Sequence, residues 1–207
     1  MSTLNSKGTH LYFACEHDQN IYQLEIKTHL ITSILIDTLR NGRPVISPDD
    51  RLITFNTNRE NEADKNDLWL MTVKGDSLKR LTRNSTYYYS ASWSPDGTML
   101  AYSAGKWGSR HIWLFSLETL TSKLIIDAKG NNCLPQWSPD GKRIAFYSDR
   151  NDNKDIWVFE LATERLQQIT FHKANDVCPQ WSPDGRKIAF ASNRTGNMEI
   201  WIVEIRQ

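Results

Sequence analysis

The hydrophobic positions of the chain fall into short runs that are separated by polar turns. Within residues 133–170, one stretch ends at Trp137, and two nearly continuous apolar runs then occupy residues 143–148 and 155–161. A thinner and more polar segment follows at residues 166–170. Continuous apolar runs of this length indicate β-strands covered on both faces, and the thinner segment is typical of an outer strand. Because no window has the 3.6-residue period of an amphipathic helix, this stretch predicts four β-strands.

The same pattern recurs along most of the chain. Residues 135–141 read Pro-Gln-Trp-Ser-Pro-Asp-Gly, residues 179–185 repeat these letters 44 positions later, and residues 93–97 repeat the last five 44 positions earlier. Residues 46–50 read Ile-Ser-Pro-Asp-Asp, and the first repeat is degenerate. A fixed period of this length indicates an array of like units. The predicted units are approximately residues 1–36, 43–82, 89–127, 133–171 and 177–207.

Four-stranded units of this length predict an all-β fold, a β-propeller in which each sheet is one blade. The motif at residues 135–141, with Ile-Ala-Phe at 144–146, Ile-Trp at 156–157 and Ile-Thr at 169–170, resembles the TolB-type propeller repeat. That repeat occurs in the C-terminal domain of TolB and in prolyl-oligopeptidase-like enzymes. The resemblance covers nearly the whole chain and implies a single domain of about five antiparallel four-stranded blades. Many unrelated functions share such blades, so it implies little about chemistry.

The terminal blades are predicted to be incomplete. An apolar fourth-strand residue follows the third-strand aromatic by twelve positions in the first four repeats, and its fifth counterpart would fall beyond Gln207. Residues 1–3 are all that remain for the first strand of the first repeat. The alternative is part of a larger ring, because TolB-type rings more often resemble six blades. Open blade faces would then favour a homo-oligomer that forms through the end blades.

An aspartate occupies the turn between the first and second strands of each well-formed repeat. In the Ser-Pro-Asp-Gly sequence of a type I turn, Pro presets φ and Ser and Asp bond to the nearby backbone. Because the aspartate recurs, we interpret it as turn chemistry rather than as a catalytic set. The positions are Asp49, Asp96, Asp140 and Asp184.

Charge and composition exclude several classes of function. The net charge of the 207 residues is +1, so no global field would draw the chain to nucleic acid or to an anionic membrane. Residues 1–10 are polar, and no segment is long and apolar enough to cross a bilayer. We therefore expect a soluble protein, cytoplasmic as written and periplasmic if a leader has been removed. Three cysteines are too few for a disulfide framework and are expected to be free thiols, with a Cys133–Cys178 bridge as the alternative.

Seven of the eight tryptophans lie at repeated positions, which favours packing between blades over a functional role. These predicted core residues are Trp93, Trp137 and Trp181 before the turn, and Trp69, Trp113, Trp157 and Trp201 in the third strand. Trp107 is the exception, because it lies in a loop where other repeats carry polar residues. It predicts either a recognition anchor or a side chain that folds back over its own blade.

The loops between second and third strands, with those that join blades, are expected to form the functional rim. They contain a mixture of aromatic and cationic residues that is typical of interaction surfaces: Tyr87, Tyr88, Trp107, Arg59, Arg150, Arg194 and His172. The three arginines recur two residues after the second-strand Thr or Ser. Their recurrence favours structural ion pairing, and an anion site on one rim is the alternative.

The sequence predicts no cofactor. Asp149, Asn151 and Asn153, with Asp155 further on, imitate the spacing of a calcium loop, but Lys154 stands where that loop needs Gly. Oxygen-rich loops recur in the neighbouring repeats, so we favour solvated turns and keep calcium as the alternative. The chain has no cluster of His or Cys, no nucleophile elbow, no phosphate loop and no zinc-binding helix motif.

Three functions are compatible with this pattern. The leading hypothesis is a non-enzymatic TolB-like propeller that binds a protein or peptide through the rim carrying Tyr88 and Trp107. A second is a propeller enzyme, or an accessory domain of one, that acts on oligosaccharides or peptides, although no catalytic constellation supports it. A third is a propeller fragment whose main property is self-assembly.

Overall fold

The computed structural model describes residues 2–60, 65–83 and 88–205. The chain divides into two compact units, Met1–Tyr88 and Tyr89–Gln207. Every regular element in the described residues is a β-strand, and the strands pair antiparallel apart from one two-residue parallel contact. Within these residues there is no helix that could span a membrane.

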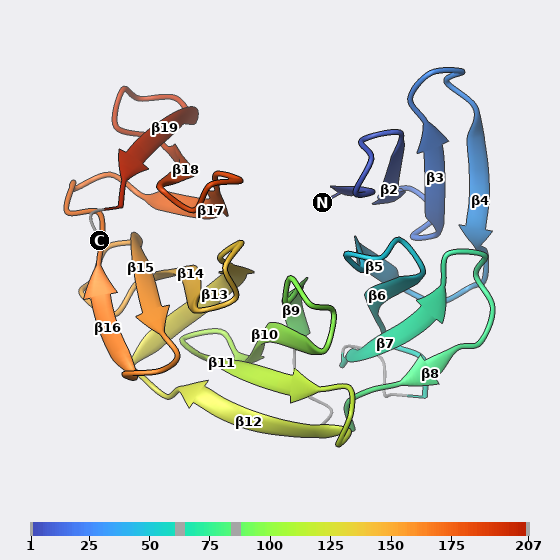
Figure 1. Cartoon of the computed structure of the whole chain (residues 1–207), viewed down its shortest axis with the longest axis horizontal. Coiled ribbons are helices and arrows are strands. Elements are labelled where there is room, and N and C mark those ends of the chain that lie inside the picture. The colour runs from blue at the N-terminus through green and yellow to red at the C-terminus, as the bar shows by residue number, and fades with distance from the viewer. Residues whose placement is uncertain (1, 61–64, 84–87, 206–207) are drawn as a thin grey trace. The chain divides into compact units, whose positions relative to one another are not determined.

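The first unit contains two four-stranded sheets in simple sequential order (Figure 1, blue to green). The first sheet is β1 (Ser2–Leu4), β2 (His10–Ala14), β3 (Ile21–Glu25) and β4 (Ile31–Leu35). The second sheet is β5 (Asn41–Ile46), β6 (Leu52–Thr57), β7 (Asp67–Thr72) and β8 (Lys79–Arg80).

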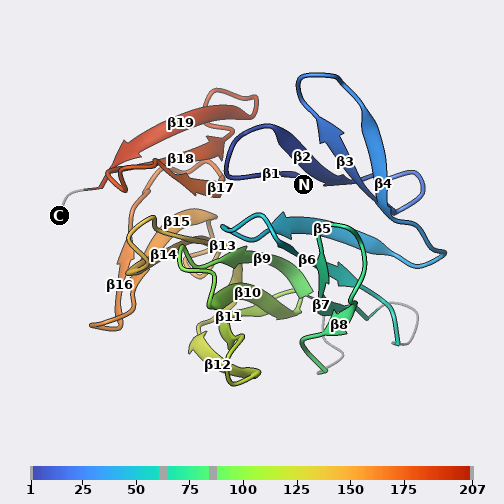
Figure 2. The same cartoon turned by 45° about the vertical axis from the view of Figure 1, so that its right-hand side comes forward.

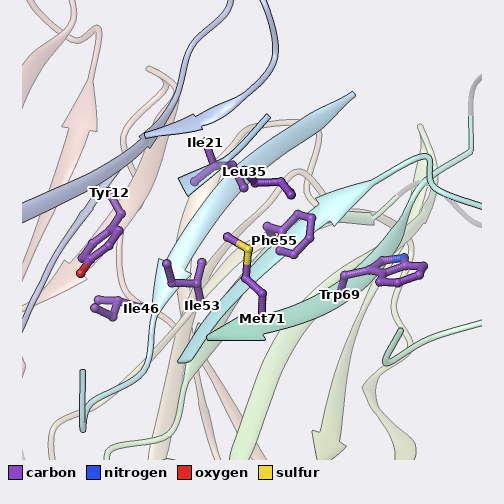
Figure 3. Packing of buried hydrophobic residues seen from close by; sticks show 8 residues of the cluster. All are labelled: Tyr12, Ile21, Leu35, Ile46, Ile53, Phe55, Trp69 and Met71. Carbon is purple, nitrogen blue, oxygen red and sulfur yellow. The ribbon is translucent and has the colours of Figure 1, made fainter. Parts of the chain in front are cut away.

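A common hydrophobic core joins these two sheets (Figure 3). Ile21 and Leu35 of the first sheet face Phe55 and Met71 of the second, and three of these four side chains are completely buried. Burying one large apolar side chain contributes about 1.5–3 kcal/mol. The continuous apolar runs of the sequence therefore supply the face-to-face packing that holds neighbouring sheets together.

The second unit continues the pattern with three further groups of strands (Figure 2). They are β9 (Tyr88–Trp93), β10 (Met99–Lys106), β11 (Ser109–Ser116) and β12 (Thr121–Ile126), then β13 (Gly130–Trp137), β14 (Arg143–Ser148), β15 (Asp155–Glu160) and β16 (Arg165–Gln168), and finally β17 (Asp176–Trp181), β18 (Lys187–Ser192) and β19 (Glu199–Glu204). The first two groups are linked where Ser109 and Arg110 of β11 pair in parallel with Gly130 and Asn131 of β13. This link places the tip of the β10–β11 hairpin beside the start of β13.

The packing between sheets repeats within this unit. Phe146 and Ile144 of β14 are completely buried in two clusters that include β11 residues, and Ile188 and Phe190 of β18 pack in a third cluster with β13, β14 and β15. The last sheet has three strands among the described residues, in agreement with an incomplete terminal blade. Its strand β19 leaves Ile200 and Ile202 exposed.

The turns that join the first and second strands share one set of hydrogen bonds. In the β13–β14 turn, the Ser138 hydroxyl donates to Asp140 and accepts from the Arg143 backbone N–H at 2.9 Å. The N–H of Gly141 donates to the Ser138 carbonyl, and Gly141 has a left-handed φ of 68°. Asp50 takes this left-handed position in the second repeat with a φ of 61°. Its carboxylate accepts hydrogen bonds from the backbone N–H and the hydroxyl of Ser6.

The first strand of three repeats contains a β-bulge before its tryptophan or isoleucine. In each case the residue that precedes the strand proline has a left-handed φ, at Arg43, Leu134 and Cys178. A following proline disfavours the right-handed helical region, and a bulge places one extra residue in the strand. Pairing therefore continues past the bulge, and β13 begins at Gly130 rather than near Leu134.

Candidate functional site

Trp107 is presented at the tip of the β10–β11 hairpin. Lys106 pairs with Ser109, so Trp107 and Gly108 form a two-residue turn, and Gly108 supplies the positive φ of 89°. The Trp107 side chain is 64% exposed. Its ring lies 4.9 Å from the guanidinium carbon of Arg110, which stacks against it. The hairpin thus holds a large aromatic surface in solvent with a cation beside it.

Asn131 ties this hairpin to the end of β14. Its side-chain oxygen accepts a hydrogen bond from the N–H of Gly108 at 2.7 Å. Its backbone N–H and side-chain amide donate to the two carboxylate oxygens of Asp149, at 2.6 and 2.7 Å. Arg150 follows Asp149 directly. We call Trp107, Arg110, Asn131, Asp149 and Arg150 the loop cluster.

The guanidinium of Arg150 is held from several directions. Nε donates to the hydroxyl of Ser148 at 2.9 Å, and Nη2 donates to the side-chain oxygen of Asn132 at 2.7 Å. The guanidinium carbon lies 4.4 Å from the Trp157 ring and 5.6 Å from the Phe146 ring. Burial lowers the pKa of Arg150 from its ordinary value. The cation is therefore fixed in orientation, and its printed partners within the chain are neutral groups and aromatic faces.

Arg194 occupies the same position in the β17–β19 sheet but has an anionic partner. Its Nη2 lies 3.1 and 3.0 Å from the two oxygens of Asp176, whose side chain is completely buried. The guanidinium carbon lies 4.4 Å from the Trp201 ring. Here the arginine closes an internal ion pair.

Arg59 occupies the same position in the first unit and also pairs with a carboxylate. Its Nη2 forms an ion pair with Asp37, and its guanidinium carbon lies 5.7 Å from the Trp69 ring. Asn41 donates to the same carboxylate at 2.7 Å. Two of the three repeated arginines are thus neutralised from within their own unit.

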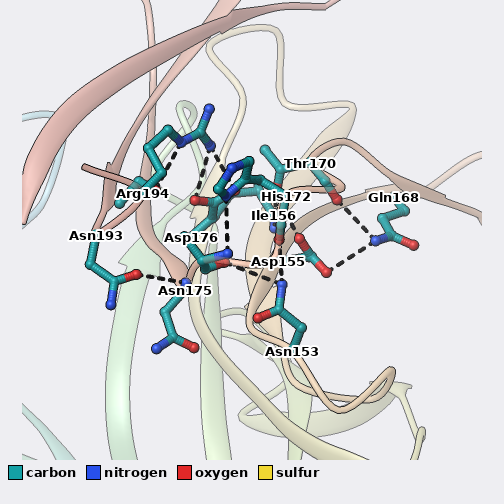
Figure 4. A network of polar contacts seen from close by, with 12 residues as sticks. Asn153, Asp155, Ile156, Gln168, Thr170, His172, Asn175, Asp176, Asn193 and Arg194 are labelled. Atoms are coloured by element: carbon teal, nitrogen blue, oxygen red, sulfur yellow. Dashed lines mark hydrogen bonds and ion pairs between the residues drawn. The ribbon is translucent and has the colours of Figure 1, made fainter. Parts of the chain in front are cut away.

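A polar network joins the ends of β15 and β17 (Figure 4). Asp155 is buried and accepts hydrogen bonds from Thr170 at 3.2 Å and from Gln168 at 3.1 Å. Burial, with a smaller contribution from the nearby carboxylate of Asp176, raises the pKa of Asp155. His172 is exposed, and its Nδ1 accepts a hydrogen bond from the backbone N–H of Ala174 at 3.0 Å. The network ties the connection between two sheets and leaves His172 at its surface.

Two predicted rim residues cannot be placed as side chains. Tyr87 lies outside the described residues, and Tyr88 is described only by its backbone in β9. The residues of the calcium alternative bond to the protein itself: Asn131 takes both Asp149 oxygens, and the amide of Asn153 donates to the carbonyls of His172 and Ala174. Within residues 2–60, 65–83 and 88–205, no three His, Cys, Asp or Glu side chains form a group that could hold a metal ion.

The repeated tryptophans differ in burial. Trp69 and Trp93 are buried, and the other five are partly buried: Trp113, Trp137, Trp157, Trp181 and Trp201. The indole N–H of Trp181 donates to the carbonyl of Gln136 at 3.1 Å, which links two neighbouring sheets. The repeated turn aspartates each accept the hydroxyl of the preceding turn serine, at Asp49, Asp96, Asp140 and Asp184. Hydrogen bonding to Ser94, followed by bonds to Thr98, lowers the pKa of Asp96.

The thiols lie in different surroundings. Cys133 is completely buried, and Nη1 of Arg110 lies 3.9 Å from its sulfur. Burial raises the pKa of the Cys133 thiol. Cys15 is partly exposed and Cys178 is exposed, and all three cysteines are free.

Sequence reasoning missed Arg110, Asn131 and Asn132, which complete the surroundings of Trp107 and Arg150. The signal that could have identified Asn132 is its place 18 residues before Arg150. Asp176 lies 18 residues before Arg194, and Asn41 lies 18 residues before Arg59. Because the first and second strands pair in the same register in each repeat, this spacing brings the two residues together.

Comparison with known proteins follows the same pattern. The family model described as TolB beta propeller domain matches residues 90–207. No curated protein sequence matches the chain. Among solved structures, a protein described as a TolB from Agrobacterium tumefaciens is similar with a TM-score of 0.86 and 22% identity, over 99% of this chain and 76% of that one.

Two further structures extend the comparison. TolB from Acinetobacter baumannii gives a TM-score of 0.82 and 19% identity, over 98% of this chain and 51% of that one. An oligogalacturonate lyase in complex with manganese gives a TM-score of 0.74 and 18% identity, over 100% of this chain and 65% of that one. The chain thus spans only about half the length of the Acinetobacter protein. At these identities the similarity shows a shared fold.

Proposed function

Because the chain belongs to the TolB beta propeller domain family, we propose that it is a non-enzymatic propeller that binds a protein or peptide through the loop cluster. The observation that carries the proposal is the presentation of Trp107. An aromatic side chain that is 64% exposed normally costs hydration free energy, yet the hairpin turn and the hydrogen bond from Gly108 to Asn131 hold it in solvent. Exposed aromatics beside arginine are the residues that most often dominate binding energies.

The neighbouring cations support this role. Arg110 stacks on the Trp107 ring, and Arg150 lies next along the chain to Asp149, which Asn131 connects to the hairpin. Aromatic and arginine side chains are enriched at interfaces because they combine apolar area with directional hydrogen bonds. Tyr87 and Tyr88 extend the proposed surface on the strength of the sequence alone.

A selection from a random peptide library displayed on phage, with the full chain as bait, tests the proposal. Peptides that bind through the loop cluster should lose about 30-fold in affinity for Trp107→Ala, the effect of removing a residue worth about 2 kcal/mol. Phe171→Ala is the matched control, because Phe171 is 76% exposed and lies outside the cluster. Both variants should keep the melting temperature of the wild-type chain. Binders that are equally sensitive to both substitutions, or to neither, would refute the proposal.

The enzymatic alternative has the shared fold as its support. The similarity to the oligogalacturonate lyase covers the whole chain at 18% identity. Incubation of the chain with oligogalacturonate, followed at the absorbance of unsaturated products, tests lyase activity directly. Product formation above that of a heat-denatured control would favour an enzyme over a binding protein.

A further inference from the structure

The three repeated arginines have different internal partners, and the difference can be traced to two positions. The residue 18 positions earlier is Asp176 for Arg194, and this aspartate provides the carboxylate. For Arg59 the residue 18 positions earlier is Asn41, and Asp37, four residues before it, provides the carboxylate instead.

Arg150 has neither of these carboxylates. The residue 18 positions earlier is Asn132, which offers an amide oxygen, and the residue four positions before that is Ala128. The side-chain amide of Asn132 bonds to the carbonyl of Ala128 at 3.1 Å, so the two residues keep the same relation as Asn41 and Asp37. Alanine therefore stands where the equivalent repeat in the first unit supplies a negative charge.

Arg150 consequently has no carboxylate partner among the residues that the structure describes. The nearest acidic residue along the chain, Asp149, has both oxygens bonded to Asn131. Of the five N–H groups of a guanidinium, Arg150 uses one on Ser148 and one on Asn132. The remaining donors are available to a ligand, because Arg150 is partly exposed.

The environment of Arg150 favours a planar anion. Stacking on the Trp157 ring fixes the plane of the guanidinium, and the two hydrogen bonds fix its rotation. A fixed guanidinium matches the two oxygens of a carboxylate better than a mobile ammonium does. Arg110 adds a second cation to the same cluster beside Trp107.

We propose that Arg150 binds a carboxylate of the partner, so that the loop cluster recognises an acidic peptide. The carboxylate comes from an acidic side chain or from a C-terminus, and it takes the place that Asp37 and Asp176 hold in the other repeats. This inference rests on the proposed function and specifies its ligand. Trp107 supplies apolar contact and Arg150 supplies the charge that selects the partner.

Three fluorescent octapeptides with a common Gly and Tyr background test the inference. The first carries Glu and an amidated C-terminus, the second carries Gln and a free C-terminus, and the third carries Gln and an amidated C-terminus. Fluorescence anisotropy gives the dissociation constant of each. One of the two carboxylate peptides should bind the wild-type chain about tenfold more tightly than the neutral peptide, as expected for a charge-assisted hydrogen bond. Which of the two it is identifies the source of the carboxylate.

Two variants should remove this preference by different routes. Arg150→Gln deletes the cation, and Ala128→Asp installs the carboxylate that the equivalent position carries in the first unit. The matched controls are Arg165→Gln, with the same loss of charge on the exposed strand β16, and Asn175→Asp, with the same added charge beside the next sheet. Both controls should keep the tenfold preference. Melting temperatures establish that each variant is folded, and Arg150→Gln decides the matter if Ala128→Asp does not fold.

The inference is overturned if Arg150→Gln keeps the preference, or if neither carboxylate peptide binds the wild-type chain more tightly than the neutral one. The proposed function fails by a separate result, a peptide selection that yields no binder dependent on Trp107. Neutral binders that depend on Trp107 but not on Arg150 would leave the proposed function standing and refute the inference alone.

Discussion

The guanidinium of Arg194 lies 3.0 Å from an oxygen of Asp176, and that aspartate has no exposed side-chain surface. The equivalent Arg150 faces the neutral amide of Asn132 at 2.7 Å. The same fold therefore holds one arginine as half of a buried ion pair and the other as a cation without an internal counter-charge. The two positions should respond differently to the same substitution.

Arg194→Gln should destabilise the second unit by about 3–5 kcal/mol, because it leaves the buried charge of Asp176 without a partner. Arg150→Gln should cost only about 0.5–1.5 kcal/mol, since it removes stacking and neutral hydrogen bonds but strands no charge. Urea denaturation followed by tryptophan fluorescence measures both. The double variant Asp176→Asn with Arg194→Gln should be more stable than Arg194→Gln alone. Equal losses at Arg150 and Arg194 would contradict the assignment of different partners.

The stability of the second unit should depend on the ionisation of Asp155. Burial raises the pKa of this carboxyl in the folded protein. Its contribution to the free energy of unfolding is therefore fully present below the unfolded pKa of about 3.9, and it decreases as the pH rises through the raised folded pKa. Asp155→Asn does not titrate, so its melting temperature relative to wild type should increase from about pH 4 to pH 7. A difference that stays constant across this range would show that Asp155 titrates alike in both states.

Two glycines in the β10–β11 hairpin should differ in their tolerance of a side chain. A Cβ at Gly105 would lie 2.3 Å from the carbonyl oxygen of Ser109, so Gly105→Ala must displace the backbone that presents Trp107. A Cβ at Gly108 would meet no atom within 4 Å, and Gly108→Ala should cost about 1 kcal/mol through its positive φ alone.

Binding of the selected peptides to these two variants measures the effect on the hairpin. Gly105→Ala should reduce peptide affinity nearly as much as Trp107→Ala, and Gly108→Ala should reduce it much less. Equal affinities for the two glycine variants would show that the position of the hairpin does not control binding.

The strand pattern could be predicted closely from the hydrophobic runs. The run at residues 143–148 coincides with β14, and the run at 155–161 differs from β15 by one residue. The first strand was predicted too short, because the bulge at Leu134 continues the pairing in a conformation that non-glycine residues rarely adopt. The available signal was the repeated residue before proline, at Arg43, Leu134 and Cys178, which is restricted to few backbone conformations.

The candidate site could be predicted only in part. An unrepeated aromatic identifies Trp107 from sequence, since repetition explains the other tryptophans. The partner of each repeated arginine could not be predicted, because it depends on which of two positions, 18 or 22 residues earlier, carries a carboxylate. Asp37 and Asp176 lie at different ones of these two positions, so the pattern becomes visible only when the strands are paired in space.

The burial of Cys133 has a practical consequence for kinetics. Its thiol is completely buried at the edge of the loop cluster, and burial raises its pKa, so a thiol reagent cannot reach a reactive thiolate while β13 and β14 remain paired. In a chain whose Cys15 and Cys178 are replaced by Ser, the rate of labelling at Cys133 becomes a clock for the transient opening of this sheet. A bound peptide should slow that clock, and the slowing would reveal its binding without any label on the peptide itself.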